Sequence, residues 1–384
     1  MTKTGQIPTI VLLGNDPGDE QWSMLAYGRY LSDQLGRFDQ VGVRVALKTP
    51  MGRPWHRWLR QRGRLGRVAA LYWSRYVEYP HLARPCQADL YHILDHGNGW
   101  LIRYLDPAKT IITCHDLIPL VLRGMRRSRW PWLTEALFEH ALAGLRQARV
   151  VIADSPCTRR DLVAHMGIPE ARIWVVPQAI RDDLRPPVMD GEQAAARKAF
   201  QLPEGPLLLH LGHTEFYKNL EGVLRAIAVL SARGESVRLV RAGARLPPHL
   251  WQVARRLGIA ERIVDLGSIP GAQVPQLYWA ADVLVYPSWY EGQGLPPLEA
   301  MASGLPVVVS DRGALPETVK AAGLLVNPAA PGELADAVAR ILHDPPLRAA
   351  LRARGLERAA DFRGDVCARQ TLAVYQAVLE SSWE

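Results

Sequence analysis

The sequence predicts an α/β protein of two doubly wound, Rossmann-like domains that face each other across a cleft. Short apolar runs alternate with amphipathic stretches along the chain, an order typical of parallel sheets covered by helices. A polar, proline-rich stretch at 181–205 interrupts the alternation, which then begins again, so we interpret this stretch as a linker. The 384 residues also exceed the size of one usual core, which favours two domains.

In the first half, apolar runs predict strands at 8–15, 41–47, 88–94, 110–116, 149–155 and 172–180. The amphipathic stretches between them predict helices at 19–36, 51–78, 131–148 and 156–166. The last of these helices has a clear start, because Ser155 is a good N-cap residue and Pro156 suits the first helical position.

In the second half, strands are predicted at 206–212, 237–243, 262–267, 281–288 and 305–311. Helices are predicted at 218–233, 247–257, 271–280, 296–304, 331–343, 345–361 and 365–380. We place the two domains at 1–185 and 186–362. Residues 363–384 are expected to form a C-terminal helix that packs back toward the N-terminal domain.

The composition is ordinary for a globular protein, with 48% hydrophobic and 22% charged residues. No apolar run is long enough to cross a bilayer. The N-terminal apolar run is short and continues into the first strand, so we expect no signal peptide and a cytoplasmic protein. The four cysteines are scattered without a CxxC pair, so we expect reduced thiols and no metal site; they are Cys86, Cys114, Cys157 and Cys367.

Basic residues are unevenly distributed in a chain whose net charge is +8. The segment 51–80 carries seven arginines, three tryptophans and three tyrosines against one glutamate, and 123–132 is similar. Basic residues among aromatics are typical of contact with an anionic membrane surface or with nucleic acid. The alternative is a solvated helix face whose tryptophan rings are buried.

Two glutamates mark the stretch "PSWYEGQGLPPLEAMASGLPVVVSD", residues 287–311. Glu291 is expected in the loop after a buried strand and Glu299 in the first turn of the next helix. Gly294 lets the backbone approach a ligand, and its amide and that of Leu295 would lie at the helix N-terminus, where anions bind. The pair therefore indicates a site for phosphate and hydroxyls together. The alternative is that each carboxylate only favours the helix dipole.

A second anion-binding geometry is predicted at 212–219. A strand ends at Gly212, and a short loop leads to Lys218 at the start of a helix. A lone lysine is otherwise usually a solvated surface residue. No GxxxxGK[ST] or GxGxxG motif occurs at these strand ends, so neither a kinase-type phosphate loop nor a nicotinamide dinucleotide site is favoured.

The second half of the chain resembles the donor domain of the family 4 glycosyltransferases (glycosyl transferases group 1), which are retaining enzymes of the GT-B fold. The resemblance rests on "LGHTEFYKN" (211–219) and on "LGSIPGAQVPQLYWAADVLVYPSWYEGQGLPPLEAMASGLPVVVSDRGALPETV" (266–319), which contains the family's Glu-x7-Glu motif. It is strong over 206–345. It is weaker over the first half, where "YHILDHG" (91–97) and "TIITCHDLIPL" (110–120) fit.

The resemblance implies a role for each matching donor-site residue. Glu299 would hold the ribose hydroxyls and Glu291 would contact the transferred sugar. The amides of Gly294 and Leu295 would bind sugar or diphosphate, and Lys218 would neutralise the leaving diphosphate.

The same resemblance assigns further positions around the donor and the acceptor. Gly212 would line the donor site, and the backbone around Ile269 would meet the nucleotide base. His115 would face the sugar from the first domain, near the acceptor. The alternative for His115 is a satisfied structural histidine. Asp95 and His96 end a neighbouring strand, so a polar cluster is expected there.

The sequence departs from the family pattern in three places. Tyr217 and His213 stand where the family usually has an arginine, so one positive charge on the diphosphate is missing, and Arg241 is a candidate to replace it. Gln293 replaces the usual aromatic residue between the two glycines. The loop "GNDPGDEQ" (14–21) lacks the Gly-Gly turn common after the first strand.

We therefore expect a retaining hexosyltransferase. It would move a sugar from a GDP- or UDP-linked donor to an acceptor hydroxyl of a glycan or lipid-linked precursor, with no cofactor and no essential metal. It would act in the cytoplasm, either free or at the inner face of the membrane. The alternatives are a sugar-nucleotide epimerase or a phosphorylase of the same two-domain plan. A basic nucleic-acid-binding protein is the alternative of another class, although no known binding module occurs and no nucleic-acid partner is expected.

Overall fold

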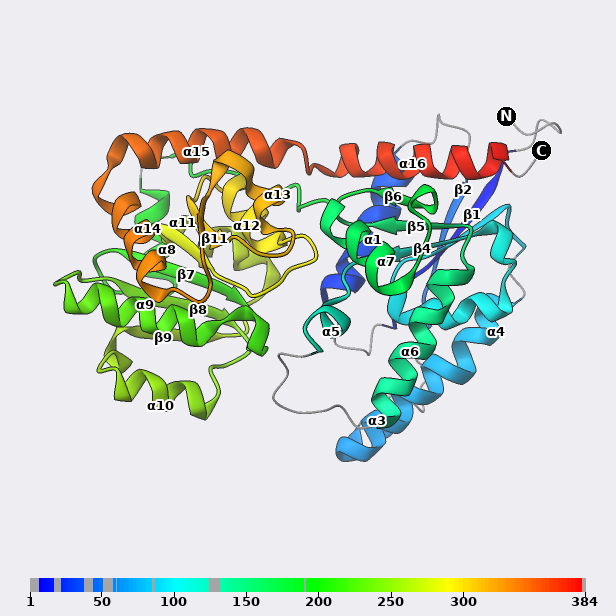
Figure 1. The fold of residues 1–384 in the computed structure, drawn as a ribbon, viewed down its shortest axis with the longest axis horizontal. Coiled ribbons are helices and arrows are strands. Elements are labelled where there is room, and N and C mark those ends of the chain that lie inside the picture. Colours follow the sequence, from blue (N-terminus) through cyan, green and yellow to red (C-terminus); the bar gives the residue numbers. More distant parts are fainter. Residues whose placement is uncertain are drawn as a thin grey trace. The chain divides into compact units, whose positions relative to one another are not determined.

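The chain forms two compact units in the computed structural model (Figure 1). Unit 1 comprises Met1–Ala179 together with Gly364–Glu384, and unit 2 comprises Ile180–Arg363. The structure describes residues 7–16, 22–37, 44–50, 58–59, 61–84, 87–123, 132–189 and 191–381. Several positions of interest lie outside the described residues: 17–21 of the first loop, 51–57, Arg60, Cys86 and 124–131.

Unit 1 is built on a parallel sheet of six strands in the order β2-β1-β3-β4-β5-β6. Its strands are β1 (Thr9–Leu13), β2 (Arg44–Lys48), β3 (Leu90–Ile93), β4 (Thr110–Cys114), β5 (Val150–Ala153) and β6 (Ile173–Val175). The three central strands β3, β4 and β5 are buried at every residue, as expected where helices cover both faces of a parallel sheet.

Helices cover this sheet on both faces, with one apolar cluster on each side. The α-helices are α1 (Trp22–Gly36), α3 (Gly63–Trp73), α4 (Tyr79–Ala83), α5 (Ile118–Val121), α6 (Trp132–Gln147), α7 (Pro156–Met166) and α16 (Gly364–Ser381). The expected cap of α7 is confirmed, since the Ser155 side chain accepts a hydrogen bond from the Thr158 amide at 3.0 Å. In the described part of the predicted helix at 51–78, α3 continues into a π-helical turn, η2 (Ser74–Glu78), and then into α4, so the chain is helical from Gly63 to Ala83.

Glycines permit one close contact within unit 1. The 3-10 segment η3 (His96–Tyr104) packs against α6, and a Cβ atom at Gly144 would lie 2.1 Å from the carbonyl oxygen of Gly99. Neither glycine tolerates a side chain there, so η3 and the strand end that precedes it are held firmly against α6.

Unit 2 contains a second parallel sheet of six strands in the order β12-β11-β10-β7-β8-β9. Its strands are β7 (Leu207–Gly212), β8 (Arg238–Gly243), β9 (Ile263–Gly267), β10 (Val283–Tyr286), β11 (Val307–Ser310) and β12 (Leu324–Val326). The α-helices are α8 (Glu192–Ala199), α9 (Leu220–Ala232), α10 (Pro248–Arg256), α11 (Val274–Ala280), α12 (Leu295–Ala302), α13 (Leu315–Val319), α14 (Pro331–His343) and α15 (Pro345–Ala360). The order of both sheets confirms the doubly wound α/β fold class.

The interpretation of 181–205 as a linker is wrong. This stretch contains α8, which packs against α11 as part of unit 2. Arg197 of α8 donates to Asp282 at 2.8 Å and to the carbonyl of Ala280 at 2.9 Å. The helix was missed because only one of its residues, Ala196, is buried, so its sequence lacks an apolar stripe.

Among the described residues, none of the helices combines the length and the apolar composition that crossing a membrane would require.

Candidate active site

A buried lysine and a buried glutamate form an ion pair at the carboxyl edge of the unit 2 sheet. Lys218 ends the short 3-10 turn after β7, and Glu291 lies in the loop after β10, the neighbouring strand. The Lys218 Nζ lies 2.8 Å from Glu291 Oε1 and 3.0 Å from Oε2, and the two side chains are only 10% and 9% exposed. A third hydrogen bond joins Nζ to the hydroxyl of Tyr286 at 2.6 Å. The sequence motifs at 212–219 and 287–299 therefore meet in one site.

Tyr286 and His210 form the floor beneath the lysine. Burial and the neighbouring Glu291 carboxylate raise the pKa of the Tyr286 hydroxyl well above its usual value, so it stays neutral. The His210 ring stacks on the Tyr286 ring with centroids 5.7 Å apart. Burial, followed by the charges of Arg241 and Lys218, lowers the pKa of His210 to about 3, so this imidazole is also neutral. Lys218 therefore lies over two neutral rings, those of Tyr286 and His210.

The backbone around Glu291 is fixed by contacts from two other segments, at Asn219 and at 313–314. Asn219 donates its side-chain amide to the carbonyls of Pro287 and Pro328 at 3.1 and 2.8 Å. The Ala314 amide donates to the Glu291 carbonyl at 3.1 Å. Gly313 has a φ of +58°, and a Cβ atom there would lie 2.8 Å from the Glu291 amide nitrogen. The loop that carries Glu291 is therefore positioned before any ligand arrives.

The second glutamate of the motif lies on α12. Gly294 caps this helix with a φ of +96°, and Leu295 is its first residue. Glu299 is the fifth helical residue, so the expectation of a first-turn position is wrong, because α12 begins at Leu295 rather than later. Its Oε2 accepts a hydrogen bond from the hydroxyl of Tyr278 at 2.8 Å. Burial raises the pKa of Glu299, although Tyr278 and then the charge of Arg181 oppose that shift.

Arg241 does not fit the place of the missing diphosphate arginine. Its side chain has no exposed surface. One guanidinium nitrogen lies 3.4 Å from Asp265, and another donates to the Gly212 carbonyl at 2.8 Å. This arginine fixes the end of β7 from within the sheet, so it offers no charge to a ligand in this conformation.

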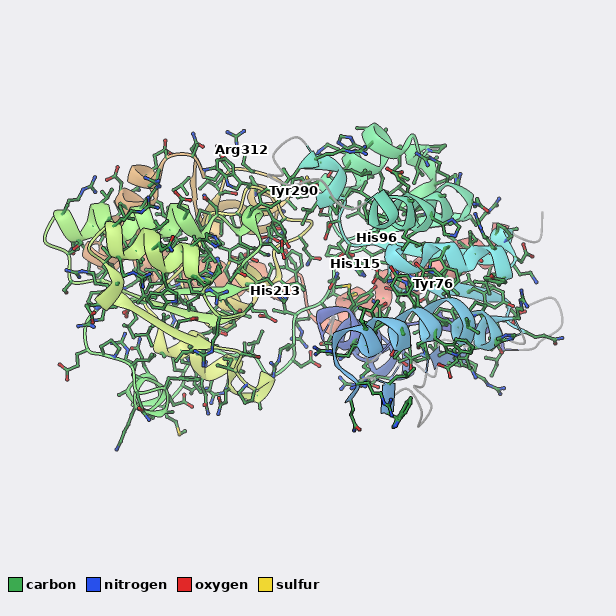
Figure 2. The ribbon with its side chains drawn as sticks, turned by 90° about the horizontal axis from the view of Figure 1, so that it is seen from below. Tyr76, His96, His115, His213, Tyr290 and Arg312 are labelled. Atoms are coloured by element: carbon green, nitrogen blue, oxygen red, sulfur yellow. The ribbon has the colours of Figure 1, made fainter. Side chains whose placement is uncertain are left out.

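Two more predicted donor-site positions lie at strand ends of unit 2. Gly212 ends β7 with a φ of +141° and contacts the backbone of Gly243, where a Cβ atom would lie 2.0 Å from the Gly212 carbonyl oxygen. Ile269 lies in the loop that follows β9 and packs, half-buried, against the apolar cluster of unit 2. Both belong to the same carboxyl edge as Lys218, while His213, next to Gly212, is exposed (Figure 2).

His115 lies at the carboxyl end of β4 in unit 1 and is 6% exposed. Its Nδ1 lies 2.8 Å from Asp154 Oδ2, and its Nε2 lies 2.8 Å from the Leu94 carbonyl oxygen. Burial acts to lower the pKa of His115, but the Asp154 carboxylate and its hydrogen bond outweigh burial and raise the pKa to about 9. The ring is therefore an imidazolium at neutral pH, with Nε2 paired to the Leu94 carbonyl and Nδ1 to Asp154, and the side-chain amide of Gln178 contacts both Nδ1, at 2.6 Å, and Asp154.

The polar cluster expected beside His115 is present. His96 lies next to His115 in Figure 2, with ring centroids 6.3 Å apart. Asp95 accepts from Asn15 at 2.6 Å and from the Gly97 amide at 2.8 Å. Burial acts to raise the pKa of Asp95, but the two histidines and these hydrogen bonds lower it, so the carboxylate is ionised.

Three participants in these sites were missed from the sequence: Asp154, Tyr278 and Tyr286. Asp154 follows β5 in the same way that His115 follows β4, and the two strands are neighbours. The sequence offered one signal for Asp154, which is that an acidic residue stands directly after a predicted buried strand. The two tyrosines gave none, because a tyrosine in an apolar run is indistinguishable from an ordinary core residue.

No group of three histidine, cysteine, aspartate or glutamate side chains is arranged to hold a metal ion within the part of the chain that the structure describes.

Comparisons with known proteins identify the family of the chain. The family model described as "Glycosyl transferases group 1" matches residues 192–358, and the model described as "Glycosyltransferase Family 4" matches 29–184. The chain is 32% identical over 291 residues to O-antigen chain mannosyltransferase B of Escherichia coli, covering 73% of each protein. The chain belongs to the group 1 glycosyltransferases, of the family 4 type.

This glycosyltransferase has further relatives and structural neighbours. It is 33% identical over 292 residues to a D-inositol 3-phosphate glycosyltransferase of Actinosynnema mirum, covering 72% of this chain and 69% of that one. Sucrose-phosphate synthase from Thermosynechococcus elongatus superposes with a TM-score of 0.72 at 23% identity, covering 97% of this chain and 100% of its own. Anabaena HepE in complex with UDP-glucose gives 0.73 at 18% identity, covering 96% and 100%. These structures show that the glycosyltransferase has the GT-B fold.

Proposed function

We propose that this glycosyltransferase moves a hexose from a GDP- or UDP-linked donor to an acceptor hydroxyl with retention of the anomeric configuration. The observation that carries the proposal is the meeting of Lys218, Glu291 and the N-terminus of α12 at one sheet edge. A cation and helix amides suit a diphosphate, and carboxylates suit sugar hydroxyls. The relative named as a mannosyltransferase supports a hexosyl donor.

Each donor-side residue has a part in the proposed binding step. Glu299 uses one oxygen for Tyr278, so its other oxygen is placed to accept from a ribose hydroxyl. The amides of Gly294 and Leu295 lie at the start of α12, where the helix dipole favours the diphosphate or the sugar. The backbone around Ile269 meets the base in this assignment.

In the proposed reaction, the bond between the anomeric carbon and the diphosphate oxygen breaks while the acceptor oxygen attacks the same face. The acceptor proton passes to the leaving diphosphate oxygen, so charge and atoms balance. Lys218 donates to the diphosphate as negative charge develops on it, which is electrostatic stabilisation of the transition state. Glu291 orients the sugar that is transferred.

His115 is assigned to the acceptor side as a fixed positive charge rather than as a proton acceptor. Both of its nitrogens are already paired, and Asp154 keeps the ring protonated. A group with that pKa is a poor general base near neutral pH.

The proposal includes no cofactor and no essential metal, because Lys218 and the helix amides supply the positive charge. Turnover is expected to stay within about twofold of the untreated enzyme after EDTA treatment. A loss of activity that added Mg²⁺ or Mn²⁺ restores would contradict this part of the proposal.

The acceptor is proposed to be a glycan or lipid-linked precursor of a polysaccharide, used in the cytoplasm or at the inner face of the membrane. The test of the proposed function is a screen of GDP- and UDP-hexoses by calorimetry. It is followed by nucleotide release and product NMR, with Lys218→Ala as the inactive control. An α-linked product from an α-linked donor is expected. Absence of both binding and nucleotide release across the panel would overturn the proposal, and an inverted product would overturn retention.

A further inference from the structure

Exposed apolar side chains concentrate in one short part of unit 1. Thirteen large apolar residues are exposed among the described residues, and six of them lie between 58 and 77. Their exposed fractions run from 37% to 86%; the six are Trp58, Leu65, Val68, Tyr72, Trp73 and Val77. The others are scattered singly or in one pair, which is normal for a protein surface. A contiguous apolar patch marks an interaction surface.

The spacing of these residues makes a stripe on α3. Leu65, Val68, Ala69 and Tyr72 follow the i, i+3, i+4, i+7 order of one helix face, and all four are exposed. The face that packs on unit 1 is a different one, carrying the buried Ala70. In Figure 1, α3 extends away from the sheet of unit 1. The face of α3 that carries Ala70 is covered within unit 1, whereas the stripe is a second apolar face and is exposed.

Charge beside the stripe points to an anionic partner. Arg62 and Arg67 are exposed on or next to α3, and no aspartate or glutamate occurs from Trp58 to Val77. The Arg62 guanidinium lies 3.9 Å from the centre of the Trp58 ring. An apolar helix face with flanking arginine and tryptophan is the pattern of helices that lie in a membrane interface. A second copy of the chain would bring arginines against arginines, which disfavours self-association through this face.

We propose that α3 docks on an anionic lipid bilayer. Its stripe enters the boundary between head groups and acyl chains, and Arg62 and Arg67 contact lipid phosphates. The proposal rests on the proposed function in one respect: docking would bring the enzyme to a lipid-linked acceptor.

Contacts inside unit 1 join this surface to the edge that holds His115. The Tyr76 ring packs on the Trp100 ring with centroids 5.0 Å apart and on the Tyr72 ring at 5.7 Å. Arg75, in the π-helical turn, donates to the carbonyl of Gly97, the residue after His96. A helix seated in the interface would therefore hold this strand edge at a fixed distance from the lipid head groups.

The test is co-sedimentation of the full chain with vesicles at low and high salt. Vesicles of phosphatidylcholine alone are compared with vesicles that also contain phosphatidylglycerol. The parent chain is expected to bind only the anionic vesicles and to dissociate as salt rises. The double variant Arg62→Ser, Arg67→Ser should bind about 30-fold more weakly, from about 1 kcal/mol for each arginine.

Matched variants separate the stripe from general changes in charge or polarity. Leu65→Ser with Val68→Ser should also abolish sedimentation, and since both side chains are exposed the melting temperature should stay that of the parent. Val163→Ser with Leu325→Ser changes two exposed apolar residues elsewhere, and Arg255→Ser with Arg256→Ser removes two exposed arginines elsewhere. Both controls should bind as the parent does.

Three outcomes would overturn the proposal. The parent chain could stay in the supernatant with anionic vesicles at low salt, or the controls could lose as much binding as the α3 variants. Sedimentation velocity could also show a dimer that Leu65→Ser with Val68→Ser dissociates, which would make this face an interface between copies. Nucleoside diphosphate affinity, measured on the same variants, should equal that of the parent. Failure of docking is thereby distinguished from failure of the proposed function.

Discussion

Both units hold a buried ion pair at the carboxyl edge of a parallel six-stranded sheet, His115 with Asp154 in unit 1 and Lys218 with Glu291 in unit 2. In unit 1, the carboxylates of Asp154 and Asp95 surround one imidazolium. In unit 2, one ammonium is shared between a carboxylate and a phenol, close to the N-terminus of a helix. The first edge suits groups that donate hydrogen bonds, and the second suits a group with negative charge.

The comparison also shows two ways to hold a cation in a buried place. His115 owes its charge to its partner, since burial alone would make the ring neutral. Its neighbour on the next strand, His92, bonds Tyr375 and Thr113 rather than a carboxylate, and burial lowers the pKa of His92 to about 3. The identity of one partner side chain therefore decides whether a histidine of this sheet is charged.

The largest expected effect concerns the cation of unit 2. Lys218→Ala should lower turnover by about 100- to 1,000-fold, because the charge that meets the leaving diphosphate is removed. Steady-state nucleotide release with saturating donor measures the change. Lys198→Ala, at an exposed position of α8, is the control and should be unchanged. Turnover of the Lys218 variant within a few-fold of the parent would show that another group supplies the charge.

Asp154→Asn should remove the charge of the unit 1 cation. The folded pKa of His115, about 9, lies above the ordinary value of 6.5, so the pair stabilises the parent fully below pH 6.5. That stabilisation is lost as the pH rises through 9 and amounts to about 3 kcal/mol at most.

The Asp154 prediction is checked by the difference in melting temperature between parent and variant. The difference should be largest near pH 6 and should shrink by pH 9.5. Asp336→Asn, which breaks the exposed pair with Arg233, should show little change at either pH. A gap between parent and Asp154 variant that does not depend on pH would contradict the assignment of charge to His115.

Glu299→Ala should weaken binding of the nucleoside diphosphate by about 10- to 100-fold, the usual worth of a hydrogen bond to a charged group. Calorimetric titration without any acceptor isolates this step. Glu261→Ala, exposed and away from α12, serves as the control. Unchanged affinity in the Glu299 variant would show that this carboxylate does not bind the ribose. The unit 2 edge would then bind only the phosphates of the donor.

The smallest effect is expected for Tyr286→Phe. Lys218 keeps Glu291 but loses one acceptor, so turnover should fall by about 3- to 10-fold with the donor KM little changed. Tyr278→Phe, which loses the bond to Glu299, should instead raise the KM. If both variants change only turnover, or both change only the donor KM, then the two tyrosines do not act separately in catalysis and in donor binding.

Much of the fold and part of the site could be predicted from the sequence. Strand ends could be recognised because the apolar runs before Lys218 and Glu291 stop at Gly212 and Pro287, so both residues could be placed at one edge. Their direct contact could not be predicted, because it depends on β7 and β10 being neighbours although 73 residues separate Lys218 from Glu291. Strand order is set by packing of the whole sheet, which a local pattern does not encode.

Arg241 shows the limit of arguing from residue type alone. An arginine near a strand end looked like a substitute for a missing diphosphate ligand. The alternation of a β-strand instead directs this side chain beneath the sheet edge, where Asp265 and the Gly212 carbonyl neutralise and bind it. The helix α8 was missed for the opposite reason, since an exposed helix with one buried residue has the composition of a linker.

The return of the chain to unit 1 through α16 sets the order in which the protein can assemble during synthesis. Unit 2 is continuous from Ile180 to Arg363, whereas unit 1 needs Gly364–Ser381 to complete a cluster that includes Ile10 and the fully buried Tyr375. The ribosome therefore releases all of unit 2 before unit 1 has its last helix. Unit 2 should fold first, although it comes second in the sequence, and the N-terminal sheet must wait with one face only partly covered, the stage at which a chaperone would bind.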